Sequence, residues 1–114
     1  MKYALLIYSS EAPDAWAQLP EEQQQSIMGE YFAISEAPGT VGGAQLQPTT
    51  TATTVRVDDG RVLTTDGPFV ETKEALDGYC TLEADDLDAA IELAARIPAA
   101  RLGGAIEVRP VVER

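Results

Sequence analysis

Residues 3–8, Tyr-Ala-Leu-Leu-Ile-Tyr, form an uninterrupted apolar run. Successive side chains of a strand point to opposite faces, so a run that is apolar on both alternating sets predicts a central strand covered on both faces. The run is far too short to cross a bilayer, and the polar, acidic stretch after it is not typical of a signal peptide. We therefore expect a cytoplasmic protein, without a membrane segment, that is organised around this strand.

Two helices are predicted. The first begins after Pro20 with two acids and ends before Pro38-Gly39. The second is capped by Asp85 or Asp86 and ends before Pro98. The residues expected to face the core are Ile27, Met28, Tyr31, Phe32 and Ser35 on the first helix, and Leu87, Ile91, Ala94 and Ala95 on the second. Residues 9–19 are expected to form a loop, with Trp16 packed onto the core.

Further strands are predicted at residues 41–46, 53–57, 61–65, 78–83 and 105–112. Asp59-Gly60 predicts a hairpin turn between the second and third of these. In the last strand, Ile106 and Val108 face one side, and Glu107 and Arg109 the other. The order of elements predicts one α+β domain over residues 1–114, a ferredoxin-like antiparallel sheet with two helices packed on one face. The other face stays uncovered, so we expect a homodimer.

The amino-acid composition argues against several classes of function and site. The chain has 19 acids and 8 bases, a net charge of −11, which argues against direct nucleic-acid binding. It has no histidine, and so lacks the commonest general base and transition-metal ligand. A single cysteine, Cys80, supports neither a zinc site nor an intramolecular disulfide, and its apolar surroundings predict a buried structural thiol. We expect no metal and no cofactor.

The segment TDGPFVETKEALDGY, residues 65–79, has two interpretations. In the first it is a bend. The carboxylate of Asp66 accepts backbone N–H groups in an Asx-type turn, Gly67 supplies unusual backbone angles, and Phe69 fills the core. A helical turn begins at Glu71 or Thr72 and runs through Leu76.

In the second interpretation the segment is part of a site. Asp66 or Glu71 acts as the acid/base, and Lys73 or Arg109 holds an anionic group. The residues expected to bind a ligand are Tyr8, Phe69, Lys73, Tyr79, Glu107 and Arg109. The residues alone leave both interpretations open.

Three stretches resemble a known family along nearly the whole chain. MKYALLIY, TTVRVDDGRVLTTDGPFVETKEALDGY and DDLDAAIELAARIPAARLGGAIEVRP are similar to the YCII-related, or DGPF-domain, family. The resemblance implies a ferredoxin-like fold of the dimeric α/β-barrel type, a homodimer, and pockets near the subunit interface. Some distant YCII relatives use a His–Asp pair, which this chain cannot supply, so the resemblance does not decide whether it is an enzyme.

Three functions are expected on these grounds. The first is binding of a small anionic or aromatic metabolite in a cleft near the dimer interface. The second is a cofactor-independent isomerase or lyase that uses Asp66 or Glu71. The third, a regulatory interaction module associated with a sigma factor, is implied only by the gene association of the family.

Overall fold

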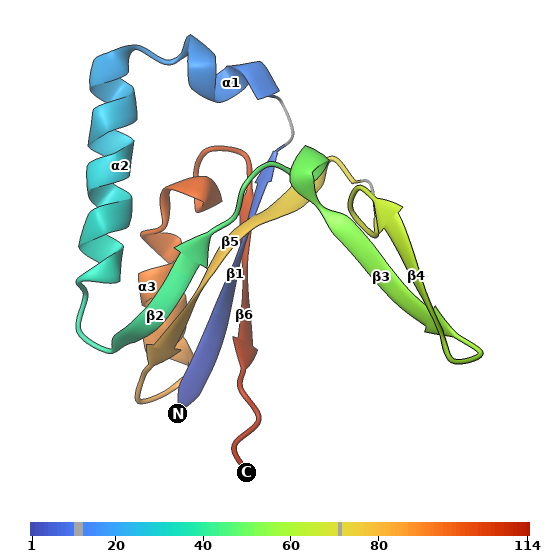
Figure 1. Ribbon diagram of the computed structural model, residues 1–114. Helices are drawn as coiled ribbons and strands as arrows, with labels where there is room; N and C mark the ends of the chain where they lie inside the picture. The colour runs from blue at the N-terminus through green and yellow to red at the C-terminus, as the bar shows by residue number, and fades with distance from the viewer. Residues whose placement is uncertain (11–12, 71) are drawn as a thin grey trace.

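The computed structural model of the protein describes residues 1–10, 13–70 and 72–114. Four strands form an antiparallel sheet in the order β2-β5-β1-β6 (Figure 1). Their bounds are β1 (Lys2–Ser10), β2 (Thr40–Gln45), β5 (Glu74–Glu83) and β6 (Ala105–Pro110). β1 lies in the interior of the sheet, as predicted, but helices cover only one of its two faces. The architecture is α+β and consistent with a ferredoxin-like fold.

Helices α2 (Glu21–Ser35) and α3 (Leu87–Ala95) lie on the same side of the sheet (Figure 1). Asp86 caps α3, and its carboxylate accepts a hydrogen bond from the backbone N–H of Ala89 at 2.9 Å. Both predicted helices are therefore confirmed. None of the helices in the described ranges is long and apolar enough to cross a membrane.

A third helix corrects the prediction of a loop at residues 9–19. Helix α1 spans Pro13–Gln18, and two short 3-10 helices, η1 (Thr49–Thr51) and η2 (Pro98–Ala100), lie in other connections. Proline is well suited to the first helical position because it has no backbone N–H, and an N–H there would have no partner within the helix. The predicted packing of Trp16 onto the core is also wrong, since 43% of the residue is exposed.

The core lies between the sheet and the helices. Tyr3 and Leu5 of β1 are almost completely buried. The other members of the core cluster are Ile34, Cys80, Leu82, Ala90, Leu93, Ala94, Ile97 and Ala99. The sheet thus buries one alternating set of β1 side chains against the helices, and Ala4, Leu6 and Tyr8 point to the other face, which we call the open face.

The predicted core stripes of the helices are only partly correct. On α2, Ile27 is buried, but Met28 and Phe32 are 62% and 68% exposed. On α3, Leu87 and Ile91 are each 48% exposed. Helical spacing indicates which residues share a stripe, but the stripe that meets the sheet depends on how each helix is rotated against it.

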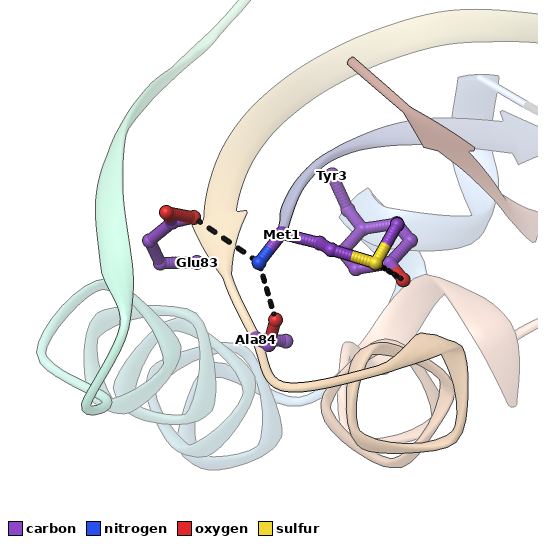
Figure 2. Close-up of polar contacts among 4 residues, drawn as sticks. All are labelled: Met1, Tyr3, Glu83 and Ala84. Carbon is purple, nitrogen blue, oxygen red and sulfur yellow. Dashed lines mark hydrogen bonds and ion pairs between the residues drawn. The ribbon is translucent and has the colours of Figure 1, made fainter. Parts of the chain in front are cut away.

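The first strand is tied to the end of β5 (Figure 2). The amino group of Met1 donates a hydrogen bond to the carbonyl of Ala84 at 2.9 Å and lies 3.8 Å from the carboxylate of Glu83. The Tyr3 hydroxyl points to the sulfur of Met1 at 3.6 Å. These contacts anchor one end of the β1–β5 pairing.

The other end of that pairing contains a β-bulge. Ile7 pairs with Gly78 but Tyr8 pairs with Leu76, which leaves Asp77 as the extra residue of β5. The hydroxyl of Ser9 donates to the Asp77 carboxylate at 3.1 Å. The strand therefore begins at Glu74 rather than Gly78, and the helical turn expected through Leu76 is wrong.

Strands β3 (Thr53–Asp58) and β4 (Arg61–Asp66) form a separate hairpin, which we call the arm. Its turn has positive φ at both Asp59 (51°) and Gly60 (76°), as a type I′ turn requires. The predicted hairpin is therefore confirmed. The arm extends away from α2 and α3 (Figure 1). It contributes to a radius of gyration of 16.0 Å, compared with about 13 Å for a compact domain of this length.

Candidate functional site

A shallow recess of about 550 Å³ opens where β1, β5 and β6 meet the base of the arm. Its lining residues are Tyr8, Thr72, Lys73, Glu74 and Glu107. They come from the end of β1, the segment leading into β5, and β6, so the recess exists only because these distant segments are brought together by the sheet.

Tyr8 is positioned by close backbone packing. It pairs with Leu76 on one side and Ala105 on the other. A Cβ atom at Gly104 would lie 2.1 Å from the carbonyl oxygen of Tyr8, so only glycine allows this approach. The bulge at Asp77 and the close approach at Gly104 together set the position of Tyr8 at the edge of the recess.

Glu107 lies on the open face beside Tyr8. It pairs with Leu6, one position along β1 from the Tyr8–Ala105 pair on the same face, which makes Glu107 and Tyr8 diagonal neighbours. The Arg109 guanidinium donates a hydrogen bond to the Glu107 carboxylate at 2.6 Å. That hydrogen bond and the charge of Glu107 raise the pKa of Arg109 above its ordinary value. The carboxylate is thus partly neutralised within the protein.

Lys73 supplies the cation on the other side of the recess. Its flanking residue Thr72 donates a hydroxyl hydrogen bond to the carbonyl of Glu74. Within the described ranges, the Lys73 ammonium has no carboxylate partner within ion-pair distance. The Lys73 ammonium is therefore unpaired among the described residues, whereas the Arg109 guanidinium is bonded to Glu107.

The DGPF motif holds the base of the arm. Gly67 has a φ of 109°, its N–H donates to the carbonyl of Ala52 at 2.7 Å, and its carbonyl accepts from the hydroxyl of Thr54 at 2.8 Å. The carboxylate of Asp66 accepts no hydrogen bond from the described residues, so the expected Asx-type turn is replaced by these backbone bonds.

Phe69 does not fill the core. It is 67% exposed, and the guanidinium carbon of Arg56 lies 4.7 Å from its ring centroid, a cation–π distance. The expectation of a core position is wrong because the chain turns Phe69 toward the arm. The DGPF motif therefore anchors the arm, whereas Thr72, Lys73 and Glu74, a few residues later in the chain, line the recess.

A model of the YCII-related domain matches residues 1–114. The chain belongs to the YCII-related family. It is also similar to an uncharacterized protein of Rhizobium meliloti (strain 1021), with 36% identity over 117 residues that cover 97% of this chain and 92% of the relative. The resemblance inferred from the sequence is thereby confirmed over the full length.

In this YCII-related chain, the recess brings together three of the predicted site residues, Tyr8, Lys73 and Glu107, and Arg109 joins them through its bond to Glu107. Tyr79 lies on the open face opposite Leu6, 43% exposed, but does not line the recess.

The remaining predicted residues lie elsewhere. Asp66 ends β4 opposite Thr53, and Phe69 lies three residues after it, both outside the recess lining. Glu71 falls outside the described residues. Thr72 and Glu74 line the recess but are not among the predicted site residues. Both flank Lys73 in the sequence, and this adjacency could have indicated them.

Cys80 lies on the buried face of β5. Burial raises the pKa of its thiol, which disfavours the thiolate that nucleophilic chemistry requires. Across the described parts of the chain, no three Cys, Asp or Glu side chains are grouped as metal ligands. The described residues therefore indicate neither a reactive thiol nor a metal site.

Proposed function

We propose that this YCII-related protein binds a small molecule with an aromatic ring and one anionic group in the recess. The observation that carries the proposal is the convergence of Tyr8, Lys73 and Glu107 from three segments around one hollow. Each supplies a different kind of contact, which is typical of a site that fixes the orientation of a ligand.

Lys73 is the expected partner of the anionic group, because its ammonium donates in three directions and has no carboxylate partner among the described residues. Tyr8 offers the apolar face of its ring for stacking and a hydroxyl at its edge. The Glu107 carboxylate accepts a hydrogen bond from a hydroxyl or amine on the ligand.

The charge balance of the recess limits how much negative charge a ligand can carry. Two acids, Glu74 and Glu107, line the recess beside one lysine, and the whole chain carries −11. Such a field raises the cost of binding a multiply charged anion. A ligand with a single anionic group and a hydrogen-bond donor is therefore the class that matches the lining.

Binding is better supported than catalysis. The isomerase or lyase hypothesis assigns the acid/base role to Asp66 or Glu71, and Asp66 lies outside the recess on the arm. No pair of a nucleophile and a base is found among the described residues that line the recess.

We further propose a homodimer in which a second copy covers the open face. Leu6 and Tyr79 are a cross-strand pair on that face, and 43% of Tyr79 is exposed. Burying such apolar surface is favourable, and a twofold arrangement buries it on both copies at once. The recess, at the end of the same face, would then lie near the subunit interface.

Isothermal titration calorimetry with defined probes tests the binding proposal. We expect 4-hydroxybenzoate to bind wild-type protein with one site per chain, while neutral benzyl alcohol and trianionic citrate bind at least tenfold more weakly. Lys73→Gln should weaken 4-hydroxybenzoate binding about tenfold, the equivalent of about 1.4 kcal/mol.

Arg61→Gln is the matched control, because it removes one cation at the turn of the arm and should leave the affinity unchanged. Equal weakening by both substitutions would show a general charge effect and contradict the proposed role of Lys73. The absence of binding heat, and of any thermal stabilisation by aromatic carboxylates at millimolar concentration, would contradict the binding proposal itself.

A further inference from the structure

We propose that the arm, residues 53–66, is a dimerisation element whose apolar face packs against a second copy of this chain lying over the open face. The inference rests on the homodimer of the proposed function and adds the element that contacts the partner.

The arm has one apolar face. Val55 pairs with Thr64, and Val57 pairs with Val62, so the three valines lie on the same side of the hairpin. We call this side the valine face. Its valines are 60%, 69% and 67% exposed in chain order. An exposed cluster of β-branched apolar residues is costly in water and marks an interaction surface.

The arm lacks a core of its own. The core cluster includes no residue of β3 or β4, and the closest packing of each strand is with the other. A two-stranded hairpin alone is only marginally stable in water. Every ladder position of the arm except Thr54 is exposed. A stable hairpin at this position therefore requires that another protein surface cover one face of the arm.

The exposed area of the chain is sufficient for a stable dimer. The accessible surface is 8312 Å², whereas a compact monomer of 12.2 kDa exposes about 6,100 Å². The excess, about 2,200 Å², is more than twice the roughly 800 Å² that each partner buries in an interface of standard size. The arm contributes to this exposed area, because all but one of its ladder positions are exposed.

Charge and position favour a second copy as the occupant. Two chains of −11 repel each other, which favours association through surfaces with few acids. The four inner positions of the valine face, Val55, Val57, Val62 and Thr64, carry no charge, and the acid on the same side, Asp66, lies at the base of the arm. The arm extends from the sheet on the side away from the helices, which is where a copy covering the open face would lie (Figure 1).

Sedimentation equilibrium over a concentration series tests the inference with three single substitutions. Val62→Lys places a charge on the valine face, and Thr65→Lys places the same charge on the opposite face of the same strand. Phe32→Lys removes an equally exposed apolar side chain from α2, 68% compared with 67% for Val62. Each adds a positive charge to an acidic chain, so none weakens association through general repulsion.

We expect wild type to be dimeric, Val62→Lys to raise the dimer dissociation constant at least tenfold, and both controls to match wild type. A Val62→Lys protein as dimeric as wild type overturns the role of the arm and leaves the homodimer standing. A wild type that is monomeric at every concentration overturns both. Dissociation by Thr65→Lys or Phe32→Lys as severe as by Val62→Lys also overturns the role of the arm.

A second variant separates lost association from lost folding. Val57→Thr combined with Val62→Thr keeps the β-branched shape of both side chains and should still weaken the dimer severalfold with an unchanged circular dichroism spectrum. Unweakened association in this folded variant would likewise overturn the inference. Titration of each variant with 4-hydroxybenzoate reports on the recess separately.

Discussion

The guanidinium of Arg109 and the carboxylate of Glu107 lie two residues apart on one face of β6 and are joined by a hydrogen bond of 2.6 Å. Side chains at positions i and i+2 of a strand project from the same face, which makes this pairing a direct consequence of the strand. The bond partly neutralises the Glu107 carboxylate and leaves Lys73 as the unpaired cation of the recess among the described residues.

Removal of Arg109 should therefore change binding more than stability. In Arg109→Gln the Glu107 carboxylate keeps its full charge and repels an anionic group, so we expect the affinity for 4-hydroxybenzoate to fall about tenfold in calorimetry. The thermal unfolding midpoint should stay near that of wild type, because exposed ion pairs contribute little. If Arg109→Gln weakened binding equally in a Glu107→Gln background, where no charge is left to repel the ligand, the repulsion would not be the cause.

Gly104→Ala tests the close approach that positions Tyr8. The added methyl group would lie 2.1 Å from the Tyr8 carbonyl oxygen, and we expect a loss of about 1–3 kcal/mol in the free energy of unfolding measured with urea. Gly29→Ala is the control: its methyl group meets nothing within 4 Å inside α2, and it should stabilise the protein by about 0.5–1 kcal/mol. Equal effects of the two substitutions would contradict the steric explanation.

The buried thiol of Cys80 should make stability fall at alkaline pH. Burial raises its pKa in the folded state, so the folded protein holds the proton more tightly than the unfolded chain does. The stabilisation is complete below the unfolded thiol pKa of about 8.5 and is lost as pH rises through the higher folded value. Urea titrations between neutral and alkaline pH should show a smaller decline in Cys80→Ala. An identical decline would exclude the thiol as the cause.

Much of the fold is predictable from short sequence signals. Asp59-Gly60 predicts the arm because few residue pairs adopt positive φ twice in succession, and Pro20 and Pro38 bracket α2 because proline suits a helix start and disrupts a helix interior. These signals act over a few bonds, so they can be read without knowledge of the rest of the chain.

The orientation of elements was less predictable. Phe69 has a large apolar side chain, which is typical of a core residue. It is nevertheless 67% exposed, and its ring lies beneath Arg56, a residue of the arm. Phe32 and Ile91 share helical stripes with apolar neighbours and are nevertheless exposed. Burial depends on which surface another element presents, and no local pattern contains that information.

The sequence by itself determined helices α2 and α3, the arm, the family, and the strands apart from the start of β5, whereas helix α1 was not predicted. Tertiary structure alone decided that Lys73 and Glu107, far apart in the chain, line one recess while Asp66, seven residues before Lys73, does not. The physical reason is the antiparallel ladder: β1 pairs with β5 on one side and β6 on the other, and this pairing, rather than distance along the chain, sets which side chains meet.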